Sequence, residues 1–389
     1  EKYMKDILVI LSTVLFCFNA NAIESVASQN GVKLLRNIYI PSGLTLSNYA
    51  PPNFDRFSAT TAHKTAEVGG ISGIQMTSNT KFVAVTDARS RDSEGFTRAY
   101  KGHFTNNYTE AVIDEIILLR DQNGKPFPPN DKDPESIVVL KNGNYLWGSE
   151  ANHAIMLSKS DGTLIKNMSY LLPEYYHGDN KTFGLRKNQS IEGMSISPDG
   201  STLFVATESS LIQDGDQSTP VLPATSRILK YSINDNSEFT LVGEYTYIVS
   251  RIEKTSTFGI HDNGVSEILA LDNDHLLVME RNGFAVKKGF CCFDFNINVF
   301  KADLKEATDI RGIANLNTID TPTPIIPAQK SLYFRFNELL SGEQRIDNLE
   351  GMTFGPNING KPTLVFASDN NLQSYSTNQF VITTAGNID

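Results

Sequence analysis

Acidic side chains stand at both ends of a hairpin-like segment in the middle of the chain. In SIEGMSISPDGSTLFVATESS, residues 190–210, Glu192 precedes one apolar run and Glu208 follows the next, with an Asp-Gly turn between the runs. Such a turn between apolar runs predicts a β-hairpin. Because hairpin strands are antiparallel, both carboxylates should lie at the same end of the hairpin. Carboxylates placed in this way can bind a hard cation or activate water.

The same pattern occurs five times along the chain. The other copies are SGIQMTSNTKFVAVTDARS, DPESIVVLKNGNYLWGSEANH, VSEILALDNDHLLVMERNG and LEGMTFGPNINGKPTLVFASDNN. Every copy ends in an acid and four also begin with one, whereas the first copy has Gly73 in that place. The starting acids are Glu135, Glu192, Glu267 and Glu350, and the ending acids are Asp87, Glu150, Glu208, Glu280 and Asp369.

Repeated hairpins of this kind predict an all-β fold, and specifically a β-propeller, which repeats a four-stranded sheet around a central channel. We expect one propeller domain over residues 23–389, with six blades and with five as the alternative. The sixth blade would combine the N-terminal VKLLRNIYIPSG with the C-terminal LQSYSTNQFVITTA. Joining the two chain ends in one sheet would close the propeller and remove its exposed strand edge.

A propeller would gather these nine acids at one mouth of its channel. Carboxylates that lie close together raise one another's pKa, and buried charges without partners are costly. Bound cations, nearby arginines or protonation must therefore compensate them. A site rich in carboxylates, supplemented by backbone carbonyls, suits Ca²⁺ above all. The alternative, in which each acid caps a turn or lies in a solvated loop, is weaker for nine acids at equivalent places.

Basic residues near the acids are candidate ligands for an anionic substrate, because arginine binds phosphate through paired hydrogen bonds. Arg89 and Arg91 follow Asp87, Arg281 follows Glu280, and Arg227 is a further candidate. His153 comes three residues after Glu150 and is expected near the same mouth. No G-x-S-x-G motif is present, so a serine triad has little support.

Five ordered segments resemble the phytase-like propeller family, which is described by the esterase-like activity of phytase. They are DPESIVVLKNGNYLWGSE, NQSIEGMSISPDGSTLFVATESSLIQDGD, GVSEILALDNDHLLVMERNG, VFKADLKEATDI and NLEGMTFGPNINGKPTLVFASDNN, and the resemblance covers about residues 70–371. It implies a secreted or periplasmic propeller, with phosphoric-ester hydrolysis and Ca²⁺ dependence by analogy with β-propeller phytases. The acid–arginine ending is kept at Glu280-Arg281, whereas Asn370 follows Asp369. Because fold analogy does not establish chemistry, no catalytic role is carried over.

Three functions are open at this point. The first is a Ca²⁺-assisted phosphoesterase for a small, phosphorylated substrate, with Glu192, Glu350 and Glu135 as first candidates for water activation or metal ligation. The remaining acids of the ring would then be metal ligands. The second is a non-catalytic binding module that Ca²⁺ stabilises. The third is a propeller of the lactonase or carboxylesterase type.

The N-terminus and the overall charge bear on location and partners. Met4-Lys5, an apolar run over residues 7–18, and Ala20 and Ala22 predict a secretory signal peptide over residues 1–22, with residues 1–3 preceding the expected start. The run is too short to span a bilayer. The net charge of −10 argues against a nucleic-acid partner. We expect a monomer that is secreted or periplasmic.

Overall fold

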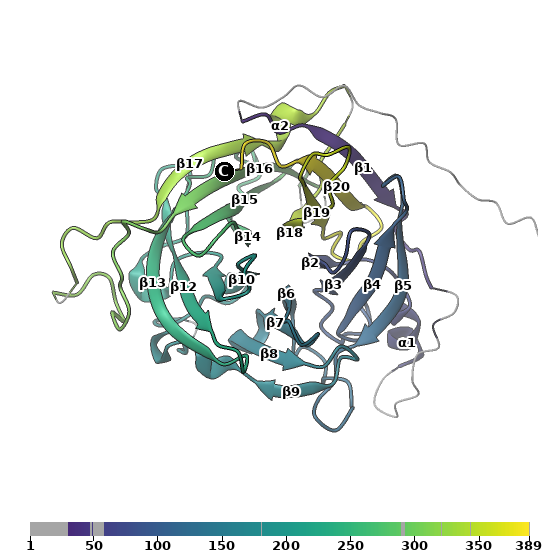
Figure 1. Cartoon of the computed structure of the whole chain (residues 1–389), viewed down its shortest axis with the longest axis horizontal. Helices are drawn as coiled ribbons and strands as arrows, with labels where there is room; N and C mark the ends of the chain where they lie inside the picture. Colours follow the sequence, from purple (N-terminus) through teal and green to yellow (C-terminus); the bar gives the residue numbers. More distant parts are fainter. Residues whose placement is uncertain are drawn as a thin grey trace, which may run out of the picture.

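Five antiparallel sheets of four strands each surround a central channel, as Figure 1 shows. The computed structural model describes residues 30–46, 49, 58–179, 181–288, 292–319, 321–342 and 344–388. The predicted signal peptide, residues 1–22, lies outside these residues. The arrangement confirms the prediction of an all-β propeller.

The blades are numbered in chain order. Blade 1 contains β2 (Ile71–Met76), β3 (Lys81–Thr86), β4 (Arg98–Phe104) and β5 (Ala111–Leu118). Blade 2 contains β6 (Pro134–Val139), β7 (Tyr145–Ser149), β8 (Ala154–Ser158) and β9 (Leu164–Asn167). Blade 3 contains β10 (Ile191–Ile196), β11 (Thr202–Thr207), β12 (Ala224–Ile233) and β13 (Phe239–Val249). Blade 4 contains β14 (Gly264–Ala270), β15 (His275–Ala285), β16 (Phe293–Asp303) and β17 (Gln329–Arg335).

Blade 5 contains β18 (Leu349–Phe354), β19 (Thr363–Ser368), β20 (Asn378–Thr384) and the first strand of the chain, β1 (Leu34–Ile40). Two α-helices, α1 (Ala59–Thr65) and α2 (Phe336–Leu339), lie in the connecting segments. No helix in the described part of the chain has the length and apolarity that a membrane crossing would need.

The two chain ends meet in blade 5, where β1 pairs with β20 in antiparallel register. Figure 1 shows this pairing as the purple strand beside the yellow one. This confirms that the ends close one sheet, but the expected number of six blades is wrong. The two end segments supply the outer strands of the β18–β19 hairpin itself, so no strands remain in them for a sixth sheet.

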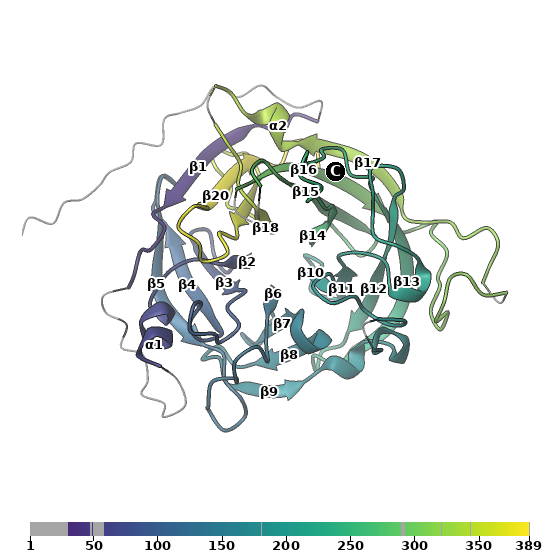
Figure 2. The same ribbon diagram turned by 180° about the vertical axis from the view of Figure 1, so that it is seen from behind.

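The inner strands are neighbours in the order β2, β6, β10, β14 and β18, and β18 lies beside β2 again. Figure 2 shows the same ring from behind. The hydrophobic core lies between successive blades. For example, Phe204 and Ile228 of blade 3 pack in one cluster with Val265 and Val278 of blade 4. Second strands such as β11 are buried throughout because neighbouring blades cover both faces, which explains their nearly continuous apolar runs.

Candidate metal centre at one mouth of the channel

A β-bulge falls at the same place in the inner hairpin of every blade. The bulged residues, in blade order, are Ser72, Glu135, Glu192, Ser266 and Glu350. A bulge leaves one residue outside the ladder and re-aims its side chain. Three blades therefore present a glutamate at this position, and two present a serine.

A second equivalent position follows the inner hairpin's second strand. Its residues, in blade order, are Asp87, Glu150, Glu208, Arg281 and Asp369. The Glu150 N–H, for example, donates to the Asp133 carbonyl at 2.8 Å, just before the first strand of blade 2. In blade 4 the corresponding pair is Gly264 and Arg281. This position therefore holds an acid in blades 1, 2, 3 and 5, and an arginine in blade 4.

Carboxylates from blades 2 and 3 form two overlapping groups at this mouth. Asp133, Glu135 and Glu150 each offer an oxygen within 4.8 Å of the others, and so do Glu150, Glu192 and Glu208. Asp133, Glu135, Glu150 and Glu208 are buried, Glu192 is half-buried, and Glu150 belongs to both groups. We call these five residues the carboxylate cluster. Of the acids predicted from the hairpin pattern, it contains Glu135, Glu150, Glu192 and Glu208.

The acids of blades 5 and 1 lie beside this cluster. The Asn348 side-chain amide donates to Glu350 Oε1 at 3.0 Å and to Asp369 Oδ2 at 3.5 Å. Burial, followed by the charges of Asp87 and Glu350, raises the pKa of Asp369 well above its usual range. The three acids Asp87, Glu350 and Asp369 therefore interact with one another and complete the acidic mouth.

Burial is the main reason that the pKa values of these acids are raised. Burial and then the charge of Asp133 raise the pKa of Asp87 and of Glu150 to about 7 each. Burial and then the charge of Glu192 raise the pKa of Glu135 well above its usual range. A cation would remove this penalty by compensating the ionised carboxylates.

Two of the predicted arginines reach the acidic mouth. Arg281 Nη1 donates to Asn348 Oδ1 at 2.8 Å and lies 3.5 Å from Glu350 Oε1, and Arg281 Nη2 lies 3.6 Å from Glu208 Oε1. Arg89 Nε lies 2.6 Å from Asp133 Oδ2. Burial alone would lower the pKa of Arg281, but the surrounding carboxylates raise it. Both guanidinium groups therefore stay charged beside the acids.

Glu267 and Glu280 do not join the other acids, although the hairpin pattern placed them in the ring. The blade 4 register puts Ser266 at the bulge and Arg281 at the strand end, one residue from each glutamate. A shift of one residue turns a strand side chain to the opposite face. Glu267 Oε1 accepts hydrogen bonds from the Met194 and Ile268 N–H groups. Glu280 accepts hydrogen bonds from Tyr247 and Lys330.

The three remaining predicted ligands differ in their surroundings. Arg227 is fully buried and pairs with Asp214 at 2.7 Å and Glu244 at 2.8 Å, so its guanidinium is already paired in the protein interior. Arg91 pairs with Glu94 in the loop after β3, and the charges of Asp133 and Asp87 also act on it. His153 ends the 3-10 helix Ala151–His153, its N–H donates to the Glu150 carbonyl at 3.2 Å, and its side chain is buried.

The hairpin pattern in the sequence does not predict three of the residues that lie at this mouth. Asp133 opens the quoted segment DPESIVVL, two residues before Glu135, and this spacing could have drawn attention to it. Asn348 stands two residues before Glu350 in the same way. Asp262 acts electrostatically on Glu208 and Arg281, and no repeat in the sequence points to it.

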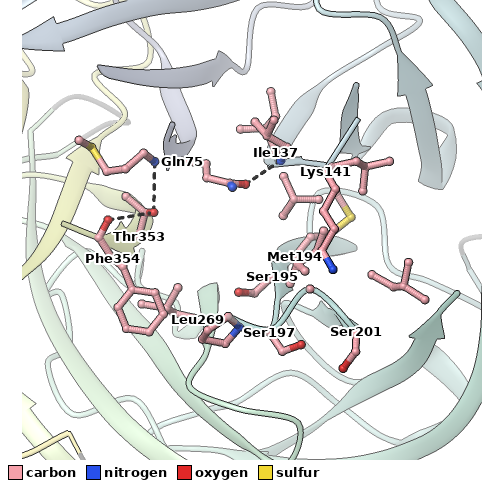
Figure 3. A pocket seen from close by; sticks show the side chains of 18 of the residues that line it. Gln75, Ile137, Lys141, Met194, Ser195, Ser197, Ser201, Leu269, Thr353 and Phe354 are labelled. Carbon is pink, nitrogen blue, oxygen red and sulfur yellow. Dashed lines mark hydrogen bonds between the residues drawn. The ribbon is translucent and has the colours of Figure 1, made fainter. Parts of the chain in front are cut away.

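The opposite mouth of the channel holds a cavity of about 690 Å³, lined by residues from all five inner strands. Figure 3 shows Gln75, Ser195 and Thr353 around it. Their side chains accept hydrogen bonds from the N–H groups of Val139, Ala270 and Met76 on adjoining inner strands. None of the predicted acids lines this cavity, and its acidic lining residue is Asp235.

The donor set at the acidic mouth fits a hard cation. The five residues of the cluster offer only carboxylate oxygens, which Ca²⁺ prefers. Asp87 Oδ1 and Asp133 Oδ1 are buried without a hydrogen-bond partner among the described residues. Buried polar atoms are normally paired, so these oxygens are available as cation ligands.

Comparisons with known proteins place the chain in a family. Similar solved structures include a glycosyl hydrolase from Bacteroides ovatus, with 10% identity, coverage of 87% of this chain and 92% of that chain, and a TM-score of 0.37. Another is virginiamycin B lyase from Staphylococcus aureus, with 10% identity, coverage of 91% and 99%, and a TM-score of 0.31. At these TM-scores neither likeness bears on the chemistry of this chain.

A comparison with curated proteins gives no match. A family model described as phytase-like, esterase-like activity of phytase, matches residues 66–372. The match spans all five inner hairpins and far more than half of the chain. The protein therefore belongs to the phytase-like family.

Proposed function

We propose that the protein is a Ca²⁺-dependent hydrolase of phosphoric esters that works at the acidic mouth of the channel. The observation that carries this proposal is the overlap of two three-carboxylate groups at Glu150, with Arg281 and Arg89 beside them. Carboxylates alone would serve a purely structural cation. The adjoining guanidinium groups add what a phosphate ester needs for binding.

Asp133, Glu135 and Glu150 would hold one cation, and Glu150, Glu192 and Glu208 would hold a second. When bound, Ca²⁺ supplies a Lewis acid that polarises the phosphoryl oxygens. Arg281 orients the phosphate from the side of blades 4 and 5. Arg89 does so from blade 1, where its side chain is partly exposed. The two guanidinium groups would thereby face the negatively charged phosphate of the substrate from two sides.

Glu350 and Asp369 belong to neither group and are the candidates for proton transfer. Burial raises the pKa of Glu350, but Arg281 favours its ionised form, which suits a general base. Burial and the charge of Asp87 keep the proton on Asp369, which suits a general acid. Glu350 would accept a proton from the attacking water. The bond between phosphorus and the ester oxygen then breaks, and Asp369 protonates the departing oxygen.

A substrate panel tests this proposal. The purified protein is assayed on p-nitrophenyl phosphate, a phosphodiester, phytate and an acyl ester, each with chelator and with Ca²⁺. We expect phosphoester turnover only with Ca²⁺, and a loss of about 10²-fold or more in Glu350→Gln. Glu110→Gln, an exposed acid in blade 1, is the matched control. Turnover of the acyl ester alone, or turnover that survives chelator, would refute the assignment.

We also propose that residues 1–22 direct export and are then removed. The support is the charged start, the apolar run and the small residues Ala20 and Ala22. N-terminal sequencing of protein recovered from outside the cytoplasm should begin at Ile23. An uncleaved chain that stays in the cytoplasm would refute this.

A further inference from the structure

A cleft of about 390 Å³ lies between blades 4 and 5, on the face of the propeller that carries the acidic mouth. One of its walls includes Phe284, three residues after Arg281 on β15. The other wall includes Asp347, the residue before Asn348. Because Asn348 contacts both Arg281 and Glu350, the cleft begins where the acidic mouth ends.

Five of the fourteen residues that line this cleft are aromatic, and they lie beside charged and amide side chains such as Asp294 and Arg345. The aromatic residues are Tyr39, Phe284, Phe293, Phe295 and Tyr375. Tyr39 is 48% exposed and Tyr375 is 58% exposed, so both present ring surface to solvent. Phe293 and Phe295 lie nearly parallel, with ring centroids 6.5 Å apart and 26° between their planes. A concave site with several aromatic faces is suited to a flat apolar ring.

The polar part of the lining is largely fixed in place. The Asp347 carboxylate accepts hydrogen bonds from the Thr377 and Asn348 N–H groups, at 2.7 and 2.9 Å. Gln379 Oε1 accepts from the Asp347 N–H at 2.9 Å. These bonds tie the cleft wall to the segment that reaches Glu350. The wall is therefore preorganised, which lowers the entropic cost of binding a ligand.

We propose that this cleft is the subsite for the organic part of the ester, and that it selects substrates in which the phosphate is attached to an aromatic ring. The inference rests on the proposed phosphoesterase function. With the phosphate beside Arg281, the remainder of the molecule extends past Asn348 and Asp347. There it meets the ring faces of Tyr375, Phe284 and Phe293. A small aliphatic alcohol cannot use these faces.

The test uses Ca²⁺-loaded full-length protein and two aromatic probes. Calorimetry with 2-naphthol, which has the ring but no phosphate, measures the cleft alone. Steady-state kinetics compare 2-naphthyl phosphate with glycerol phosphate. Tyr375→Ala removes an exposed ring of the cleft, and Tyr170→Ala removes a ring of similar exposure, 61%, on blade 2 as the matched control.

We expect one 2-naphthol site in the wild type and in Tyr170→Ala, and affinity that is about tenfold weaker in Tyr375→Ala. In Tyr375→Ala the KM for 2-naphthyl phosphate should rise by a similar factor. Its kcat and all kinetics with glycerol phosphate should stay unchanged. Phe293→Leu, which keeps an apolar side chain but no ring, should show the same pattern.

Two outcomes separate this inference from the function on which it rests. Ca²⁺-dependent hydrolysis without 2-naphthol binding, or with equal binding in Tyr375→Ala and Tyr170→Ala, would overturn the subsite and leave the phosphoesterase standing. Binding of 2-naphthol that Tyr375→Ala weakens, in a protein without phosphoester turnover, would establish an aromatic-ring site and overturn the proposed function.

Discussion

Arg281 Nη1 lies 3.5 Å from Glu350 Oε1, which joins the strand end of blade 4 to the bulge of blade 5. Arg281 occupies the position that holds an acid in the other four blades. The acidic mouth therefore has a negatively charged part and a positively charged part. Blades 2 and 3 carry the carboxylate cluster, whereas blade 4 contributes a permanent cation. This asymmetry would allow one mouth to bind both a metal ion and an anion, as the proposed function requires.

Replacing Arg281 should separate these two roles. In Arg281→Gln we expect kcat/KM for a phosphoester to fall roughly 10- to 150-fold, because a hydrogen bond to a charged group is lost. Ca²⁺ affinity should stay the same or increase, since a repelling charge is removed. Kinetics and calorimetry on the same preparation measure both quantities. Arg311→Gln, which loses an exposed pair with Asp309, is the control. A parallel loss of Ca²⁺ binding would contradict the division by charge.

The Ca²⁺-free protein should lose stability as the pH rises. The pKa of Glu150 is raised from 4.5 to about 7, and that of Asp87 from 3.8 to about 7. At a pH between the ordinary and the raised pKa values, the folded chain binds more protons than the unfolded chain. The free energy of unfolding therefore falls as the pH increases toward about 7. Ca²⁺ should remove most of this fall by replacing the protons.

Melting temperatures between pH 4.5 and 8, with chelator and with Ca²⁺, measure this effect. A chelator-treated protein whose melting temperature rises across the interval would show that these acids are ionised in the folded chain. That result would remove the electrostatic reason for a cation at this mouth.

The inner-hairpin register distinguishes two glutamates that look equivalent in the sequence. Glu192 is at the bulge of blade 3, whereas Glu267 lies one residue beyond the bulge of blade 4. Glu192→Gln should weaken Ca²⁺ binding by about tenfold or more, because it removes a charged ligand. Glu267→Gln keeps an oxygen that can accept from Met194 and Ile268, and should leave Ca²⁺ binding unchanged. Equal losses in the two variants would show that the register argument is mistaken.

Arg227 should matter for stability and not for substrate binding. Its side chain is 0% exposed, as are those of Asp214 and Glu244. Arg227→Met leaves two buried carboxylates without their cation, so the free energy of unfolding in urea should fall by about 3–5 kcal/mol. Arg335→Met breaks an exposed pair with Glu253 and should cost about 1 kcal/mol or less. A raised KM with unchanged stability in Arg227→Met would instead place this residue at the substrate.

Much of this architecture can be predicted from the sequence because the inner hairpins are local. The Asp-Gly turn and the flanking acids of the Glu192–Glu208 hairpin lie within one short segment. Their repetition predicts both the propeller and an acidic mouth. The closure by the chain ends was also predictable, since a propeller without it would expose a strand edge. The blade number was not, because the two end segments complete the sheet of the β18–β19 hairpin instead of forming a sheet of their own.

The composition of the site was harder to predict, because it depends on register. VSEILAL and IEGMSI look alike, but a shift of one residue exchanges Glu267 for Ser266 at the bulge and Glu280 for Arg281 at the strand end. Arg227 resembles a free phosphate ligand in the sequence. Its partners Asp214 and Glu244 come from a separate loop and from the next strand. Only the fold therefore shows that the Arg227 guanidinium is already paired with these two carboxylates.

Calorimetry on chelator-stripped protein tests most directly whether the carboxylate cluster holds Ca²⁺. Glu150 is shared by both three-carboxylate groups. We predict Ca²⁺ binding with proton release and a raised melting temperature in the wild type, and a larger loss of affinity in Glu150→Gln than in Glu135→Gln or Glu192→Gln. No binding heat and no change in melting temperature at millimolar Ca²⁺ would contradict the account.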